Sequence, residues 1–308
     1  MQASQKEYWA AMRPAVLCTD LDTVRQDKHA IDSALLESGA VVLKGTRVDD
    51  ASGFRDLIAV FSGRPLMNYA GGTSPRTKFD EGIYNSTEYP ADMQLDLHNE
   101  MSYLPLFPSH IYFYCEVPPG QQGATTLGDG RAILKALDRQ IVEEFARRGG
   151  VRYERFLVGD PASPYSWQSA FETTDKASAE RLCRAVGAEF DWIGDALQIH
   201  QVRASTANHP LTGQEVWFNQ AEGFHHSVLG DSLLAEMKAA ATRPRLDSCF
   251  ADGSEFDVQM LAHIRSVKRA LTHAHNWERG DILIVVNILT MHGREPFSGP
   301  RKIVVAMN

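Results

Sequence analysis

The segment that decides the fold lies at residues 280–307 and reads GDILIVVNILTMHGREPFSGPRKIVVAM. A Gly-Asp turn precedes an apolar, β-branched run at 282–287, and a loop rich in glycine and proline leads to a second such run at 302–307. This pattern predicts two buried strands, with His292 at the end of the first and Arg301 at the opening of the second. An arginine that enters a β-rich core is costly unless it meets an anion. The segment therefore predicts an anion bound beside the core.

The remaining secondary structure predicts a β-rich core with helices packed outside it. Further strands are expected at 40–44, 110–117 and 215–219, and helices at 5–12, 31–38, 52–61, 130–148, 177–186 and 255–271. Asp129 is the expected N-cap of the helix at 130–148. Strands and helices do not alternate regularly, which disfavours a doubly wound parallel sheet. No linker divides the chain, so we expect one domain over residues 1–308.

Composition and charge exclude several classes of protein. The chain has 308 residues and a formal net charge of −8, which argues against a nucleic-acid-binding protein because phosphate contacts need a basic face. The longest apolar runs are far shorter than a membrane span, and the first residues lack the apolar core of a signal peptide. We therefore expect a soluble, cytoplasmic protein that does not contact membranes. The oligomeric state is left open.

A candidate metal site begins with His98-Asn99-Glu100. On a strand, residues two apart point to the same face, so this spacing would place an imidazole beside a carboxylate. Eleven histidines and 39 acidic residues in 308 positions give about 1.4 such triplets by chance, so a surface turn is an equal alternative. A second histidine from a distant strand would complete a two-histidine, one-carboxylate set, which is typical of non-haem iron. His292 is the candidate, although a histidine that ends a strand is more often a core residue.

Five strings, taken in order, carry a family resemblance. They are GGTSPR at 71–76, STEYP at 86–90, LHNEMSY at 97–103, VWFNQA at 216–221 and HGREPF at 292–297. With them the chain resembles the taurine-dioxygenase and clavaminate-synthase-like (TauD/TfdA) superfamily of Fe(II)/2-oxoglutarate-dependent oxygenases. It is most similar to the syringomycin-type amino-acyl hydroxylase branch. The resemblance implies a fold that is mainly β with α, with a double-stranded β-helix (jelly-roll) core and surrounding helices.

The same resemblance assigns roles to individual residues. His98, Glu100 and His292 match the iron ligands, and Arg301 matches the arginine that holds the distal carboxylate of 2-oxoglutarate. Thr125 matches a threonine that also contacts 2-oxoglutarate. No catalytic residue is expected beyond the metal ligands. The long gap between Glu100 and His292 implies large insertions between barrel strands, which include the predicted helices.

Two features weaken the match on the 2-oxoglutarate side. The family pattern Gly-Gly-x-Thr begins here with Gln122, which puts the turn before Thr125 in doubt. Lys302 adjoins Arg301 and is an alternative clamp, although only one of two consecutive strand residues faces inward and arginine suits a carboxylate better.

Three other polar residues are candidates for binding substrate, namely Arg76, Asn219 and Arg294, with an ordinary structural role as the alternative for each. The pair His225-His226 is interpreted as structural or supporting, because it lies outside the matching strings. The pair formed by His273 and His275 is expected to be solvated or to cap a helix C-terminus.

The resemblance implies an oxygenase that consumes O2 and 2-oxoglutarate and releases succinate and CO2. Glu100 disfavours halogenation, because related halogenases replace this carboxylate by a small residue. We expect hydroxylation of an aliphatic C–H of an amino acid or amino-acyl group, free or tethered to a carrier protein, in natural-product biosynthesis. Desaturation or cyclisation by the same cofactors stays open. The rival classes are a zinc-dependent hydrolase with the same three ligands and a family member that binds without turnover.

Overall fold

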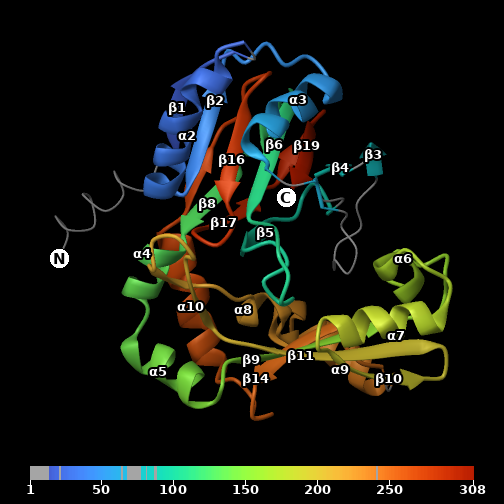
Figure 1. Cartoon of the computed structure of the whole chain (residues 1–308). Coiled ribbons are helices and arrows are strands. Elements are labelled where there is room, and N and C mark those ends of the chain that lie inside the picture. The colour runs from blue at the N-terminus through green and yellow to red at the C-terminus, as the bar shows by residue number, and fades with distance from the viewer. Residues whose placement is uncertain are drawn as a thin grey trace.

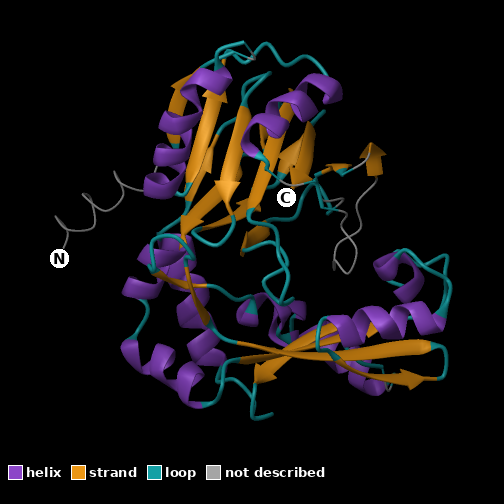
Figure 2. Ribbon diagram, in the orientation of Figure 1, coloured by secondary structure: helices purple, strands orange, loops and turns teal. Residues whose placement is uncertain are grey.

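The computed structural model describes residues 14–20, 22–63, 65–67, 78–80, 82–86, 89–240 and 242–308 (Figure 1). Three sequence features lie outside these residues, namely the predicted helix at 5–12, the string at 71–76 and Arg76 within it. Most of the described strands form two groups, a pair of facing sheets and a separate four-stranded sheet beneath them, and helices surround both groups (Figure 2). Two short two-stranded sheets account for the other strands.

The larger of the two facing sheets has seven strands and contains four of the five predicted ones. The fifth, predicted at 215–219, is the shorter strand β13 (Glu215–Trp217), which pairs with β12 (Thr206–Asn208) outside this sheet. The order of the larger sheet is β1 (Ala15–Cys18), β2 (Ala40–Lys44), β16 (Ile282–Val286), β6 (His110–Val117), β19 (Lys302–Met307), β4 (Ile83–Asn85) and β3 (Lys78–Asp80). Strand β16 pairs antiparallel with β2 and β6, and all its residues are buried. A strand covered on both faces reads as an unbroken apolar run. The sequence therefore predicted β2, β6 and β19 with their observed bounds and β16 to within one residue.

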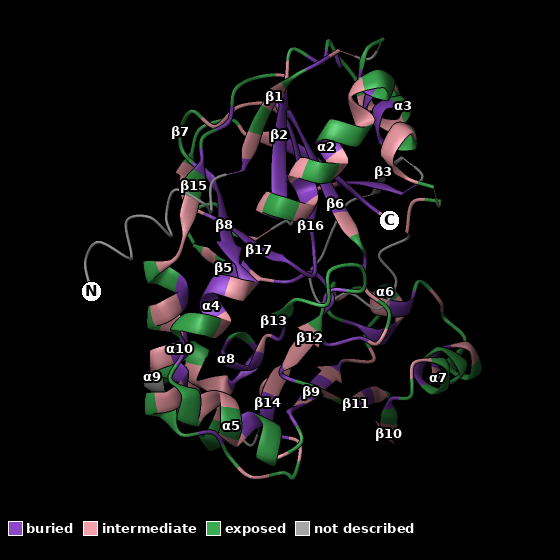
Figure 3. Cartoon of the chain, turned by 60° about the vertical axis from the view of Figure 1, so that its left-hand side comes forward, coloured by how far each residue is buried: buried purple, intermediate pink, exposed green. Residues whose placement is uncertain are grey.

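The smaller sheet lies against the larger one and carries the two candidate histidine ligands, with Glu100 two residues after the end of its strand β5. Its order is β15 (His273–His275), β8 (Thr125–Asp129), β17 (Thr290–Arg294) and β5 (Leu95–His98). Leu127 and Trp277 from this side share one buried apolar cluster with Phe113 and Leu283 of the larger sheet. Two facing sheets over a common apolar core give the jelly-roll arrangement expected from the sequence. Burial is deepest along these strands (Figure 3).

The prediction that His292 ends the strand at 282–287 is wrong. The chain turns after Val286, crosses from the larger sheet to the smaller one, and places His292 in the middle of a separate strand, β17. The turn residues Ile288 and Leu289 are buried, so apolar character continues through the turn and hides it from the sequence pattern. The buried polar side chain of Asn287 marks the turn.

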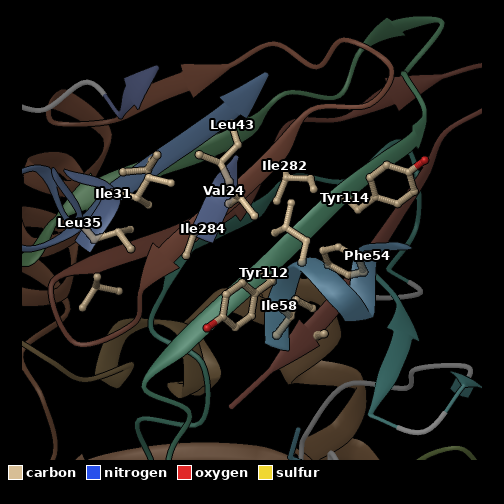
Figure 4. Close-up of a cluster of buried hydrophobic side chains, with 14 of the residues drawn as sticks. Val24, Ile31, Leu35, Leu43, Phe54, Ile58, Tyr112, Tyr114, Ile282 and Ile284 are labelled. Carbon is tan, nitrogen blue, oxygen red and sulfur yellow. The ribbon is translucent and has the colours of Figure 1, made fainter. Parts of the chain in front are cut away.

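Two helices cover the outer face of the larger sheet (Figure 4). Helix α2 (Val24–Ser38) extends the predicted helix toward its N-terminus, and α3 (Ala51–Phe61) begins at Asp50, whose side chain accepts from the Gly53 N–H. Such a cap satisfies one of the unpaired N–H groups of the first turn. Their buried side chains form one cluster with the sheet, which includes Val24, Ile31, Leu35, Phe54 and Ile58 from the helices and Leu43, Tyr112, Tyr114, Ile282 and Ile284 from the strands.

An insertion between β8 and β15 contains a sheet that the sequence analysis did not predict. Its strands are β10 (Glu189–Ile193), β11 (Ala196–Arg203), β9 (Val151–Leu157) and β14 (Leu246–Phe250), in that order. Strand β9 alternates buried and half-buried residues along VRYERFL, but the buried Arg155 interrupts the apolar face, so the period of two is hidden in the sequence. The insertion is therefore not only helical. The division of the chain into one domain stays a prediction.

The predicted helix at 130–148 is two helices, α4 (Gly130–Ala136) and α5 (Arg139–Arg147). Asp129 caps α4 as predicted, and Asp138 interrupts the run by capping α5. The other elements are β7 (Gln121–Gln122), α6 (Trp167–Phe171), α7 (Lys176–Ala185), β12 (Thr206–Asn208), β13 (Glu215–Trp217), α8 (Ala221–Phe224), η1 (His226–Leu229), α9 (Asp231–Ala239), α10 (Val258–Ala270) and β18 (Phe297–Ser298). Within the described part of the chain, every helix is too short or too polar to cross a membrane.

An aromatic cluster joins the inserted elements to one another. The ring of Phe145 lies 5.2 Å from that of Trp217, 5.1 Å from Phe250 and 5.2 Å from Phe256, measured between centroids. These residues come from α5, from β13, from β14 and from the segment before α10. The same buried cluster includes Leu97 and Met101, which flank the candidate metal ligands. Packing of the insertion is thereby coupled to the site.

We expect Phe145→Ala to lower the free energy of unfolding by about 3–5 kcal/mol, because it removes the central ring of a closed cluster. Urea denaturation monitored by circular dichroism measures this. Leu211→Ala is the matched control, since Leu211 is 78% exposed and its loss should change stability by less than about 0.5 kcal/mol. Equal stability of the Phe145 variant and the wild type would contradict the coupling described above.

Candidate active site

The structure brings His98, Glu100 and His292 together. His98 ends β5, His292 lies opposite it in β17, and their ring centroids are 4.4 Å apart. The Nε2 atom of His292 is 3.8 Å from Oε2 of Glu100, and one ligand atom from each residue lies within 4.8 Å of the others. Two imidazoles and one carboxylate at this spacing form the donor set of a facial iron site. The donors therefore fit an iron(II) ion.

The tautomer of His98 is set by the backbone. Its Nδ1 atom is 2.9 Å from the carbonyl oxygen of Asp96, an acceptor, so Nδ1 carries the hydrogen and donates. The lone pair of Nε2 is then free to bind a metal. A ligand histidine oriented by a hydrogen bond from its other nitrogen is the usual arrangement in metal sites.

Asn287 holds the segment that carries Glu100. Its Oδ1 accepts from the Glu100 N–H at 2.8 Å, and its Nδ2 donates to the carbonyl oxygens of Glu100 and Pro108, both at 2.9 Å. Asn99 donates in return to the Asn287 carbonyl at 2.6 Å. Both asparagines are fully buried. Sequence reasoning missed Asn287, although an asparagine closing an apolar run was a usable signal.

Arg301 lies beside the metal ligands without a carboxylate partner among the described residues. Its Nε donates to the Gly123 carbonyl at 3.3 Å and its Nη1 to Ser86 Oγ at 3.2 Å. Burial first, and repulsion from Arg294 second, lower the pKa of the Arg301 guanidinium to about 10. A small cavity of about 30 Å³ is lined by both Arg301 and His292. An anion bound in this cavity would balance the buried cation.

Thr125 faces the same small cavity from β8. Its Oγ1 accepts from the indole N–H of Trp277 at 3.0 Å, so the hydroxyl hydrogen remains for another acceptor. The turn before Thr125 forms despite the departure at Gln122, which adopts a φ of 54°. Trp277 is a site residue that the sequence analysis did not single out.

Lys302, the alternative clamp, faces away from this cavity. Its Nζ donates to the Glu116 carboxylate at 2.8 Å. Alternation along the strand thus separates the two neighbouring cations, as the sequence predicted, and Arg301 is the one turned inward.

The structure places two of the three residues that were predicted to bind substrate. Arg294 donates to the carbonyl oxygens of Tyr89, Pro90 and Met93 at 3.1, 2.6 and 2.8 Å, so it holds the loop that precedes β5. Asn219 is fully buried, and its amide donates to the Ser205 carbonyl and accepts from the Ala221 N–H. These contacts indicate structural roles, and a substrate contact by either side chain is not supported. Arg76 lies outside the described residues.

The pair His225-His226 forms a second group of possible ligands with Glu255. Nδ1 of His225 accepts from the Ser227 N–H, so Nε2 carries the hydrogen and has no lone pair for a metal. Burial lowers the pKa of His225 to about 4, which keeps the ring neutral. Nδ1 of His226 lies 3.1 Å from both oxygens of Asp247. These contacts favour the structural interpretation.

The expectation of a solvated or capping pair at His273 and His275 is wrong. Helix α10 ends at Ala270, and residues 273–275 form strand β15, paired with β8 so that His275 lies opposite Thr125. His275 is buried and its Nε2 is 3.5 Å from the Asp281 carboxylate. Three residues are too short a run for the strand pattern to be recognised in sequence.

A larger cavity of about 320 Å³ opens on the other side of the metal ligands. It is lined by His98 and Glu100, by residues of α8 and by one face of α10. Gln220 at its wall donates to the Asn99 carbonyl at 2.8 Å and to Ser102 Oγ at 3.0 Å, which ties this wall to the ligand segment. The ligand set thus lies beside a small cavity lined by Arg301 and a larger one lined by residues of α8 and α10.

A jelly roll that gathers two histidines and one carboxylate beside a buried arginine defines the class of non-haem iron oxygenases that use 2-oxoglutarate. The chain belongs to the family described as Taurine catabolism dioxygenase TauD, TfdA family, whose model matches residues 11–307. It is therefore an Fe(II)- and 2-oxoglutarate-dependent dioxygenase that uses O2. The predicted superfamily and cofactors are confirmed.

Known proteins agree with this assignment. The dapdiamide synthesis protein DdaC of Enterobacter agglomerans is 33% identical over 282 residues, which cover 91% of this chain and 84% of DdaC. The structure of a taurine dioxygenase from Burkholderia xenovorans matches with a TM-score of 0.56 at 12% identity, over 96% of this chain and 86% of that one. PvcB of Pseudomonas aeruginosa, described as an Fe, α-ketoglutarate-dependent oxygenase, matches with a TM-score of 0.52 at 15% identity, over 96% and 87%.

These similarities confirm the predicted fold class, a double-stranded β-helix with surrounding helices. They also disfavour the zinc-dependent hydrolase, since the family and its relatives are oxygenases. The resemblance to the syringomycin-type branch stays a prediction.

We expect Gly293→Ala to weaken Fe(II) binding at least tenfold and to lower the free energy of unfolding by about 1–3 kcal/mol. A Cβ at this position would lie 2.4 Å from the Leu95 carbonyl oxygen and 2.7 Å from Thr126 Oγ1, which would push β5 away from β17. Fe(II) titration and urea denaturation measure the two effects. Gly63→Ala is the control, because a Cβ there meets nothing within 4 Å. Unchanged Fe(II) affinity would show that the strand spacing does not govern the ligands.

We expect Arg301→Met to raise the dissociation constant of 2-oxoglutarate about a hundredfold, because a buried carboxylate loses its charged partner. Titration of the anaerobic Fe(II) protein with 2-oxoglutarate, followed by its visible charge-transfer absorbance, measures this. Lys302→Met removes the neighbouring cation and should leave the affinity within about twofold. A larger effect of Lys302→Met than of Arg301→Met would reverse the assignment of the clamp.

Proposed function

We propose that this oxygenase hydroxylates an aliphatic C–H bond of a small amino-acid-like substrate in natural-product biosynthesis. The observation that carries the proposal is the intact set of His98, Glu100 and His292, of which His98 and Glu100 line a cavity of about 320 Å³. The name of its relative DdaC, a dapdiamide synthesis protein, supports a biosynthetic role. A cytoplasmic location and a substrate either free or bound to a carrier protein belong to this proposal.

Each site residue has one task in this reaction. His98, Glu100 and His292 would hold the iron, and Arg301 and Thr125 would orient 2-oxoglutarate from the small cavity. When bound, the iron and 2-oxoglutarate supply the oxidising chemistry, in which O2 is consumed and succinate and CO2 are released. The chain contributes position, because Asn287 fixes the Glu100 segment and Asp96 fixes the His98 ring.

The carboxylate of Glu100 separates hydroxylation from halogenation. A halide would need the coordination position that Glu100 occupies, and Glu100 is buried and held by Asn287 on both sides of its peptide. Desaturation and cyclisation use the same ligand set as hydroxylation. They are distinguished by the product and not by the site.

The test is a product assay. Purified protein with Fe(II), 2-oxoglutarate and O2 is offered the twenty common L-amino acids and their carrier-bound thioesters. We expect substrate-dependent succinate and a product heavier by one oxygen atom for at least one of them. His98→Ala should lower succinate formation at least a hundredfold, because one of three metal ligands is lost.

A product lighter than the substrate by two hydrogen atoms would show that the enzyme catalyses desaturation or cyclisation and not hydroxylation. Succinate formation that no compound of the panel stimulates would contradict the proposed substrate class. Full activity of His98→Ala would contradict the metal site itself.

A further inference from the structure

One face of α10 forms a charged wall of the larger cavity. Arg265, Lys268, Arg269 and Thr272 follow the three- and four-residue spacing of a helix face, and all four line the cavity with His98 and Glu100. Thus three cations of one helix face the space beside the metal ligands. The proposed function gives them no task.

A buried ion pair forms part of this wall. Lys268 pairs with Glu222 of α8, and the two residues are only 4% and 5% exposed. Lys268 also donates to the Leu97 carbonyl at 3.2 Å, directly before the ligand His98. Oε1 of the Glu222 carboxylate accepts from Lys268, whereas its Oε2 has no hydrogen-bond partner among the described residues. A buried acceptor left unpaired costs about 1–3 kcal/mol. A donor on a bound molecule would remove this cost.

The two arginines have no acidic partner among the residues that the structure describes. One Nη of Arg265 donates to the Glu222 carbonyl at 2.7 Å and to Ser227 Oγ at 2.9 Å, which fixes the side chain. Arg269 is exposed, and its Nε donates to the Arg265 carbonyl at 3.3 Å. Their remaining N–H groups suit a carboxylate, which a guanidinium binds through two parallel hydrogen bonds.

The charge of the wall gives the same result. Its three cations face two carboxylates, Glu222 and Asp96, once the metal ligand Glu100 is set aside. The wall therefore presents charges of both signs, which suits a molecule that carries both an ammonium group and a carboxylate.

We propose that Glu222 binds an amino group of the substrate while Arg265 and Arg269 bind its free carboxylate. The inference rests on the proposed function and narrows it: the substrate is a free amino acid or a small peptide with a free carboxylate, and not a carrier-bound thioester. A thioester carbonyl carries no negative charge, so tethering would remove the group that the arginines recognise.

Binding to the anaerobic protein loaded with Fe(II) and 2-oxoglutarate tests this without turnover. The probes are the common L-amino acids, each as the free acid, the carboxamide and the pantetheine thioester, and the visible absorbance of the loaded protein reports binding. We expect at least one free acid to bind, with the amide and the thioester at least tenfold weaker. For that acid, the 2-hydroxy analogue without the amino group should also bind at least tenfold more weakly.

Two variants test the two proposed contacts separately, one for the carboxylate and one for the amino group of the substrate. Arg269→Gln should reduce the preference for acid over amide to less than threefold. Glu222→Gln, which keeps an acceptor for Lys268, should remove the preference for the amino acid over its 2-hydroxy analogue. Neither should change 2-oxoglutarate affinity more than twofold, whereas a merely structural role would weaken all ligands together and lower the melting temperature. Arg139→Gln is the control, since Arg139 is 90% exposed on α5.

Equal binding of acid, amide and thioester would overturn the proposal, and so would the absence of binding by every free acid. An unchanged preference in both variants would overturn it as well. In each case a normal 2-oxoglutarate absorbance leaves the oxygenase assignment intact. Loss of that absorbance in the wild type would instead contradict the cofactor site.

Discussion

The pairing of β5 with β17 is the constraint on which the rest of the site depends. It places His98 opposite His292, two residues 194 positions apart, in one antiparallel register. Gly293 permits the close approach, because any side chain there would strike the Leu95 carbonyl. Asn287 follows the strand before β17. Its side chain binds the backbone N–H and carbonyl of Glu100 and so places the third candidate ligand beside the two histidines. One turn and one strand pair thus assemble the complete donor set.

Charged groups on both sides of this donor set explain what the site can bind. Arg301 lies in the small cavity without an acidic partner among the described residues, and the wall from α10 carries three cations beside the larger cavity. Desolvating the Arg301 cation without a counter-charge is expensive, and a bound carboxylate would supply that charge. In the proposed function the two cavities divide the two organic reactants between them, with 2-oxoglutarate on the side of Arg301.

The insertion contributes the substrate side of the site. Its sheet and its helices lie below the barrel in Figure 1, and α8 and α10 reach the metal ligands through Gln220 and Lys268. The aromatic cluster around Phe145 holds these elements in place. The barrel therefore supplies the oxidising centre, while the insertion supplies the groups that would select a substrate. Such a division lets one chemistry serve different substrates on one scaffold.

The sequence by itself determined the strands β2, β6, β16 and β19, because residues buried on both faces must be apolar. The Asp129 cap likewise marked the start of α4. The residue types and order of the five strings were enough to identify the superfamily and to predict the residues that bind iron. Only the tertiary structure decided that Arg294 and Asn219 bind backbone groups, that Trp277 supports Thr125, and that Glu222 and Lys268 form one buried pair. These partners are distant in sequence, and a hydrogen bond depends on where two atoms meet, which no local pattern records.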